Sequence, residues 1–256
     1  MRATNYKITA VRGCGVIMEA LCGVLGEPPV PQGSWERDAW FVSTVALRGT
    51  AEAAGATPRA TAEAPAEVAE RLAARLRAVP GIRRVDVRPN GFLVIGLATP
   101  GEIVEDVLAA PVAVPPPPGA SAAPWPDFPR TWDNPGFAVR YAYVRAGAVR
   151  RWARDLGVRT GAAVRPELLD GPFDRAVLRV LAELPSRRES RDPGWAAYLE
   201  RLAEAYHTAV ERAAPIPRGD EPPSELHAAR VRMGEAVRRV LGEGLVELGV
   251  APPGKI

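Results

Sequence analysis

The stretch from Pro111 to Pro129 constrains the fold of this chain more than any other feature, because eight of its 27 prolines lie there. Proline lacks an amide hydrogen and fixes φ, so this stretch cannot form a helix or a central strand. The run Pro115–Pro118 favours an extended, semi-rigid spacer of about 3.1 Å per residue. The sequence therefore predicts two domains, residues 1–110 and 134–256, which a Pro-rich linker over 111–133 holds tens of ångströms apart.

The part before the linker is predicted to be an α+β domain. A single apolar stripe indicates a helix over Ala66–Val79, which Pro80-Gly81 ends. Two short apolar runs, Ile82–Val87 and Phe92–Leu97, flank Asn90-Gly91, which is a strong hairpin signal. The other helices expected here are Val16–Leu25, Ala39–Ala54 and Glu102–Ala109.

The part after the linker is predicted to be entirely helical. Asn134 is a good N-cap and Pro135 suits a first helical turn, while Ser224 is a second N-cap. The predicted helices are Pro135–Leu156, Phe173–Leu184 with Pro185 as its stop, Trp195–Ala213, and Ser224 to Leu248. The expected fold class is therefore an α+β N-terminal domain followed by an all-α helical bundle.

Positive charge is concentrated in the first helix after the linker and in the residues that follow it. Between residues 137 and 165, seven arginines face one acid, so this segment alone carries about +6, against +3 for the whole chain. The arginines are Arg140, Arg145, Arg150, Arg151, Arg154, Arg159 and Arg165, and the acid is Asp155. Such a concentration indicates a surface for a negatively charged partner.

The helical spacing of this segment separates three faces. The residues that share the predicted core face are Val139, Ala142, Ala146, Val149 and Ala153. Arg140, Arg151 and Arg154 lie roughly opposite, whereas Tyr141, Arg145 and Trp152 form a line beside the core face. Aromatic and arginine side chains on one line suit stacking on unpaired bases combined with phosphate contacts. The alternative is a solvated basic helix whose aromatic rings pack at the rim of the bundle.

The sequence lacks the patterns of the common catalytic and metal sites. His207 and His227 are its only histidines, and no Cys/His spacing suits zinc. Neither Gly-rich phosphate fingerprint nor a Gly-x-Ser-x-Gly elbow occurs, so we expect a binding protein, not an enzyme, with no cofactor and no metal. Cys14 and Cys22 are too few for a disulfide framework, and no apolar run approaches the roughly 20 residues of a membrane span. A reduced cytoplasmic setting is therefore expected, with no membrane as partner.

Several motifs follow the pattern of one known family. After the linker these are Asn134-Pro135, the runs Val139–Arg145 and Leu202–His207, and the last helix from Ala229 to Val250. In these positions the chain resembles the DALR-type anticodon-binding domain of arginyl-tRNA synthetases. Before the linker, a similar resemblance to that family's additional N-terminal domain rests on Val45-Ala46-Leu47, Ala69–Leu72, Pro80-Gly81-Ile82 and Gly91-Phe92-Leu93.

The resemblance implies two tRNA-contacting modules with no catalytic domain between them. In the family, that domain carries a His-x-Gly-His signature and a Lys-Met-Ser-Lys loop. Neither signature occurs here, and no lysine lies between Lys7 and Lys255. Several family positions also differ. Tyr143 stands in place of a His, Arg140 in place of a Gln, and Val94 in place of an Asn that the family uses at the tRNA elbow. An aromatic pair and an Asn that usually follow the family's Phe-His are Ala209, Val210 and Glu211 here.

The preferred hypothesis is a non-catalytic relative of arginyl-tRNA synthetase that binds tRNA or structured RNA in the cytoplasm. The residues expected to contact RNA are Tyr141, Arg145, Trp152, Arg140, Arg151, Arg154, Tyr206, His207, Arg230 and Arg238. A protein-interaction or regulatory module, which docks a synthetase or self-associates, is the alternative that the lost aromatic pair and the Val94 change favour. A subunit that completes a split arginyl-tRNA synthetase in trans is the third hypothesis.

Overall fold

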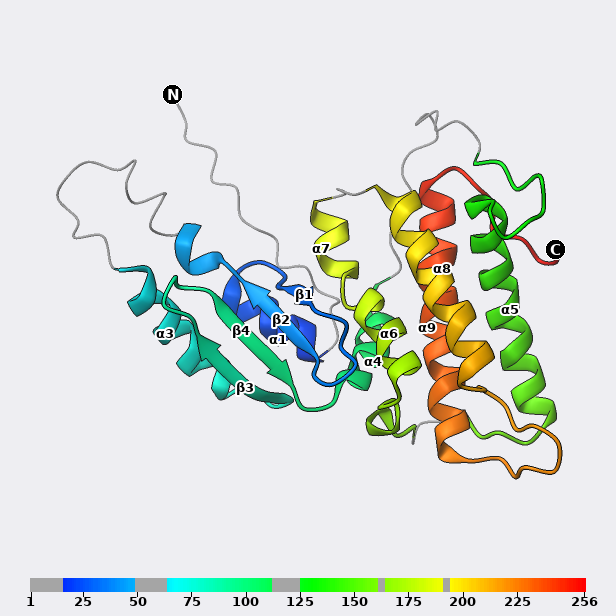
Figure 1. Ribbon diagram of the computed structural model, residues 1–256, viewed down its shortest axis with the longest axis horizontal. Coiled ribbons are helices and arrows are strands. Elements are labelled where there is room, and N and C mark those ends of the chain that lie inside the picture. Colours follow the sequence, from blue (N-terminus) through cyan, green and yellow to red (C-terminus); the bar gives the residue numbers. More distant parts are fainter. Residues whose placement is uncertain (1–15, 49–63, 112–124, 161–163, 191–193) are drawn as a thin grey trace.

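The structure is a computed structural model that describes residues 16–48, 64–111, 125–160, 164–190 and 194–256. A small sheet with its helices occupies one end of the long axis, and a group of longer helices occupies the other (Figure 1). Cys14 and residues 112–124, the middle of the predicted linker, lie outside the described ranges. None of the helices in those ranges combines the length and the apolar character that crossing a bilayer requires.

The expected α+β part is confirmed, and its sheet is entirely antiparallel. The elements are α1 (Val16–Leu25), β1 (Val30–Gln32), β2 (Trp40–Ser43), α3 (Pro65–Arg77), β3 (Ile82–Val87), β4 (Leu93–Leu97), the 3₁₀ turn η1 (Pro100–Glu102) and α4 (Ile103–Ala109). The strand order is β1-β2-β4-β3. The predicted hairpin joins β3 to β4, and Gly91 adopts the positive φ of 80° that its turn requires.

The predicted helix Ala39–Ala54 is wrong at its start, because Trp40–Ser43 is the strand β2. Phe41 and Ser43 face the core, while Trp40 and Val42 lie on the other face, so burial alternates with the period of a strand. Aromatic and β-branched residues suit such a half-buried sheet, and pairing with β4 fixes the strand. Helical conformation begins only at Val45, and residues 49–54 lie outside the described part.

The part after the linker contains three long helices that pack on one another. The elements are α5 (Pro135–Asp155), the 3₁₀ turn η2 (Pro166–Leu168), α6 (Pro172–Leu181), α7 (Leu184–Glu189), α8 (Trp195–Arg212) and α9 (Glu225–Glu247). Both predicted N-caps are confirmed, since the side-chain oxygen of Asn134 accepts from the first amides of α5 and the Ser224 hydroxyl accepts from an amide of α9. The prediction that Pro185 stops the second helix is wrong. The helix ends at Leu181, and Pro185 lies in the first turn of α7, where its missing N–H leaves no unpaired donor.

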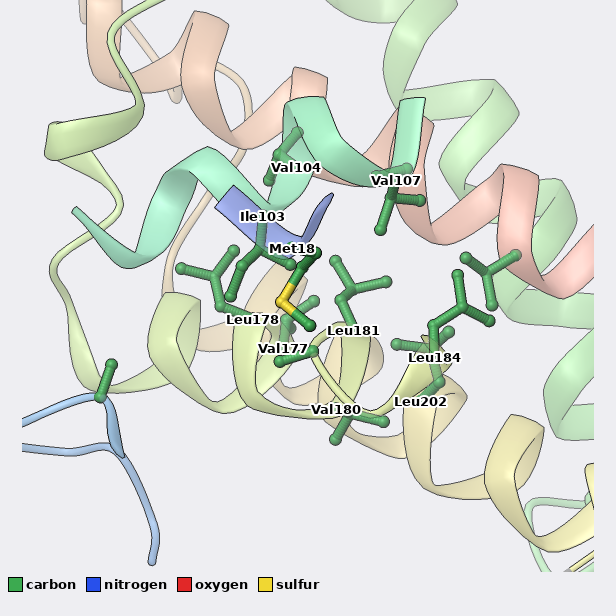
Figure 2. Packing of buried hydrophobic residues seen from close by; sticks show 14 of the residues in the cluster. Met18, Ile103, Val104, Val107, Val177, Leu178, Val180, Leu181, Leu184 and Leu202 are labelled. Carbon is green, nitrogen blue, oxygen red and sulfur yellow. The ribbon is translucent and has the colours of Figure 1, made fainter. Parts of the chain in front are cut away.

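The expectation that the linker holds two domains tens of ångströms apart is also wrong. One continuous cluster of buried residues includes Met18 of α1, Ile103 and Val107 of α4, and Leu178 and Leu181 of α6 (Figure 2). The apolar face of α4 therefore packs against the helices after the linker. A single helix cannot bury its own apolar face, and packing against α6 and α9 removes this face of α4 from water.

Polar contacts fix the same junction. Arg239 of α9 donates to the carbonyls of Leu108 and Ala110, which are left free at the C-terminal end of α4. Arg232 of α9 holds Glu105 through two hydrogen bonds of 2.8 Å. These contacts complement carbonyl and carboxylate groups of α4 with guanidinium groups, so the helix is positioned by charge as well as by apolar packing.

The tightest point of the junction lies between η1 and η2. A Cβ added at Gly101 would lie 2.0 Å from the carbonyl oxygen of Pro166, so Gly101→Ala forces the backbone apart. We expect this substitution to lower the free energy of unfolding by about 1–3 kcal/mol, measured by urea denaturation. Gly23→Ala in α1 is the matched control, because its Cβ meets nothing within 4 Å and alanine favours a helix. Equal midpoints for the two variants would contradict the prediction.

Candidate nucleic-acid interface

The core face predicted for α5 is confirmed. All five of its members are buried, namely Val139, Ala142, Ala146, Val149 and Ala153. This face packs mainly against α9 and α8, and α5 lies on the side of the molecule remote from the sheet (Figure 1). The line of Tyr141, Arg145 and Trp152 consequently runs along the edge of the helix, where it borders α8 and the loop that follows α8.

Four aromatic rings meet at the beginning of α5. We call Trp132, Phe137, Tyr141 and His207 the ring cluster. Trp132 lies edge-on to Tyr141 and to His207, with ring centres 5.3 and 5.0 Å apart, and Tyr141 stacks on His207 at 5.5 Å. Phe137 stacks on Tyr141 at 5.8 Å. Since 59% of Trp132 is exposed, the ring cluster presents a large aromatic surface to solvent.

A groove continues from the ring cluster along α5. It encloses about 360 Å³ between α5 and the residues that follow α8. Its walls are mostly apolar, and its charged members are Arg145 and Arg218. The lining residues are Tyr141, Val144, Arg145, Ala148, Val149, Trp152, Val210, Ala214, Pro215, Ile216, Pro217 and Arg218. Tyr141 belongs to both the ring cluster and the groove, so the two form one continuous surface.

Arg145 is held in place at the junction of the groove and the ring cluster. Its Nη1 lies 3.3 Å from Nδ1 of His207 and 3.5 Å from Oε1 of Glu211. Burial of the imidazole lowers the pKa of His207, and the nearby Arg145 charge lowers it further, against the hydrogen bond with Ala138 and the charge of Glu211. His207 is therefore neutral near pH 7.

Trp152 and two of the predicted arginines lie exposed on the last turns of α5. Trp152 is 52% exposed, and Arg151 beside it has no acidic partner within the described part of the chain. Arg154 is exposed and lies 3.5 Å from its neighbour Asp155. Arg150 points differently, because its Nε lies 3.1 Å from the carboxylate of Glu235. The exposed positive charge of this helix is thus smaller than its composition implies.

Arg140 does not face solvent as the helical spacing predicts. Its guanidinium donates to the carbonyl oxygens of Gly136 and Trp125, both at 2.7 Å. The side chain therefore holds the segment before α5 against the helix. A Cβ at Gly136 would lie 2.1 Å from the carbonyl oxygen of Pro126, so this approach is close.

Tyr206 lies in the core and not on the surface. It is 1% exposed, so its ring is not available to stack on a base in this arrangement. Its hydroxyl has no hydrogen-bond partner among the described residues and packs against Gly234 of α9. Burial accordingly raises the pKa of the Tyr206 hydroxyl. The structure thus removes Tyr206 from the side chains that could touch RNA directly.

Arg230 and Arg238 are engaged with other side chains of the protein. Arg230 donates to both carboxylate oxygens of Asp174 at 3.1–3.3 Å, and the side chain of Asp174 is only 1% exposed. Arg238 donates to the hydroxyl of Tyr143 at 2.9 Å and lies 4.4 Å from the centre of its ring. The predicted RNA contacts are therefore brought together only in part, as Tyr141, Arg145 and Trp152 with the edge of His207.

Sequence reasoning missed Trp132, Phe137, Glu211 and Arg218. Trp132 lies within the predicted linker, and Arg218 lies in a loop for which helical spacing gives no neighbours. The signal that was available is the pair of aromatic residues on either side of the Asn134 cap, since the cap fixes how the chain enters the helix. No group of three or more metal-ligating side chains occurs among the residues that the structure describes.

Comparison with known proteins relates part of this chain to a tRNA ligase. An arginine–tRNA ligase from Clavibacter sepedonicus is 42% identical over 129 residues, which cover 48% of this chain but only 23% of the ligase. No protein-family model matches the chain, and no solved structure matches it. The chain is thus related to arginyl-tRNA synthetases and matches less than a quarter of such a protein.

Proposed function

We propose that this chain binds tRNA, or another structured RNA, and does not itself activate an amino acid. The observation that carries the proposal is the continuous surface of the ring cluster and the groove, on which aromatic rings lie beside Arg145 and Arg218. Relatedness to an arginine–tRNA ligase supports tRNA as the RNA concerned. The proposal implies a cytoplasmic protein, because it shares a compartment with its RNA.

The chemistry of this surface suits unpaired nucleotides. Trp132 and Trp152 offer exposed flat rings, and each stacked base contributes about 1–3 kcal/mol of binding free energy. Tyr141 already stacks on Phe137 and His207 and lines the groove. Arginine is the residue best suited to phosphate, because its planar guanidinium donates two parallel hydrogen bonds. Apolar walls with a few fixed charges are also the usual make-up of a ligand groove. The anticodon-type helical domain implied by the resemblance would place such a surface on an RNA loop.

The second part of the proposal, that this chain does not activate an amino acid, rests on the sequence. The His-x-Gly-His and Lys-Met-Ser-Lys signatures do not occur, and the part shared with the ligase is 23% of that protein. The resemblance implies that the Pro-rich residues stand where the family has its catalytic domain. A fluorescence titration with bulk tRNA therefore tests the proposal, and a charging assay with arginine, ATP and tRNA should give no product.

Binding should weaken steeply with salt, because phosphate contacts release counterions. With three to five such contacts we expect the affinity for bulk tRNA to fall by about 10- to 100-fold between 50 and 200 mM salt. Substituting Tyr141, Arg145 and Trp152 together with Ala should abolish binding while the circular dichroism spectrum stays unchanged. Arg75→Ala is the control, since it removes an arginine from α3 at the opposite end of the molecule (Figure 1).

Failure of micromolar tRNA to bind at low salt would overturn the proposal and favour the protein-docking alternative. Full binding by the triple variant would instead overturn the assignment of the α5 surface. In that case the RNA would be held elsewhere on the chain.

A further inference from the structure

His207 links the aromatic and the charged parts of the α5 surface. Its ring stacks on Tyr141 and meets the edge of Trp132, and one of its ring nitrogens lies against Arg145. The imidazole is 8% exposed, so most of it serves as packing and only an edge reaches solvent. His207 therefore contacts both Tyr141 and Arg145.

The partners of the two ring nitrogens determine its protonation state. Nε2 lies 3.1 Å from the carbonyl oxygen of Ala138, which can only accept, so Nε2 must carry a hydrogen. Nδ1 lies 3.3 Å from Nη1 of Arg145, which can only donate, so Nδ1 must be bare. Both contacts are satisfied by one species alone, the neutral imidazole with its hydrogen on Nε2.

We infer that His207 is a positioning residue, which keeps Arg145 and Tyr141 in their RNA-binding arrangement only while its imidazole is neutral. The inference rests on the proposed function of the α5 surface. A proton added at Nδ1 points a second donor at the Arg145 guanidinium and places two positive charges side by side. Arg145 must then turn away from His207, and the ring stack on Tyr141 loses its neighbour.

The charges around His207 all lie on α5 and α8. Arg145 and Tyr141 face it from α5, and Glu211 lies one turn further along α8. Within the described residues, no charged side chain of α6 or α9 contributes to the pKa of His207. Glu211 contacts the same Nη1 as His207 does and is mostly exposed, so it can retain Arg145 in a new position when the imidazole is charged.

The affinity for RNA is expected to fall in acid, which is the opposite of what the net charge of the protein alone predicts. Acidification makes a protein more positive and normally strengthens its binding to RNA. Here the neutral form binds RNA better, so RNA binding lowers the pKa of His207 and acid weakens the complex. A difference of one pKa unit between free and bound protein gives a tenfold loss of affinity, which is complete below the pKa of the bound state.

The test is a titration of the full chain with bulk tRNA at constant ionic strength, at steps from pH 7.5 to pH 5.0. We expect the affinity of the wild-type chain to fall as His207 takes up a proton, and the loss to approach tenfold below the pKa of the bound state. His207→Gln keeps a neutral donor and acceptor and should bind with little pH dependence. His207→Ala should bind weakly at every pH, because Arg145 loses its contact with the imidazole and Tyr141 loses the ring that stacks on it.

The other histidine of the chain supplies the control. His227→Gln keeps the capping box with Ser224, so this variant should fold normally and retain the wild-type pH profile. Circular dichroism at each pH shows whether the fold is intact. Binding that stays constant or strengthens in acid, or a His207→Gln variant with the full wild-type profile, would overturn the inference while leaving the proposed function in place. Absence of tRNA binding at every pH would overturn both.

Discussion

Replacing Arg230 with Met should lower the free energy of unfolding by about 3–5 kcal/mol, because it leaves the buried carboxylate of Asp174 without its partner. Asp174 lies inside α6, and Arg230 reaches it from α9 with three contacts of 3.1–3.3 Å. Even in the intact pair, burial raises the pKa of Asp174 above its usual value against the opposing effect of Arg230. Denaturation in guanidinium chloride at pH 7.5 measures the loss.

The stability of Arg230→Met should depend on pH, because the pKa of Asp174 is raised. Without Arg230 the pKa of Asp174 rises further, so its carboxyl takes up a proton on mild acidification and the buried charge disappears. The destabilisation should therefore be smaller at pH 5 than at pH 7.5. The double variant Asp174→Leu/Arg230→Met is the control and should regain most of the lost stability. A loss below 1 kcal/mol in the single variant would show that water reaches Asp174.

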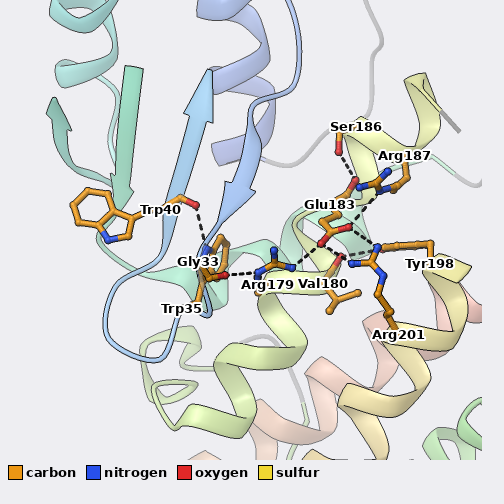
Figure 3. Close-up of polar contacts among 10 residues, drawn as sticks. All are labelled: Gly33, Trp35, Trp40, Arg179, Val180, Glu183, Ser186, Arg187, Tyr198 and Arg201. Atoms are coloured by element: carbon orange, nitrogen blue, oxygen red, sulfur yellow. Dashed lines mark hydrogen bonds and ion pairs between the residues drawn. The ribbon is translucent and has the colours of Figure 1, made fainter. Parts of the chain in front are cut away.

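Replacing Glu183 with Ala should have the second largest effect, about 2–3 kcal/mol. The Glu183 carboxylate is buried and accepts hydrogen bonds from Arg179, Arg187 and Arg201 (Figure 3). Its removal leaves three guanidinium groups close together. These groups reach water more readily than Asp174 does, so the loss is smaller than for Arg230→Met. Arg179 also donates to the carbonyl of Gly33, so the contact with the loop before β2 should loosen as well.

At acidic pH, the difference in free energy of unfolding between Glu183→Ala and the wild-type chain should become smaller. Burial alone would raise the pKa of Glu183, but the hydrogen bonds and charges of Arg201 and Arg179 outweigh it and lower the pKa. A lowered pKa means that the stabilisation is present above the ordinary value of 4.5 and disappears as the pH falls through the folded-state pKa. Glu167→Ala removes an exposed acid and is the control, with an expected change below about 1 kcal/mol. Equal losses in both variants would contradict the prediction.

Local signals in the sequence predicted most of the helices and one hairpin. Asn134 and Ser224 mark helix starts because their side chains satisfy free amides, and that chemistry needs no tertiary contact. The strand Trp40–Ser43 was missed because its four residues are stable as a strand only when paired with β4. The shared core was missed because the number of prolines in the linker says nothing about the apolar face of α4.

The candidate site could be predicted only where it depends on one helix. The spacing of Tyr141, Arg145 and Trp152 is a property of α5 itself, and the structure keeps all three on the groove. The placement of Tyr206 depends on how α8 packs on α9, which helical spacing within α8 does not specify. The ion pair between Arg230 and Asp174 joins side chains 56 positions apart in the sequence, so no local pattern reveals it.

The contacts of α4 with α6 and α9 predict how the structure responds to insertions or deletions in the Pro-rich segment. They set the position of the sheet relative to α5, so this spacing does not depend on the number of residues between Ala110 and Trp125. Insertions or deletions in that interval should leave the two ends of the molecule at the same separation. An RNA large enough to contact both the sheet and α5 would therefore meet these two elements at a fixed separation, which does not change with the length of the proline tract.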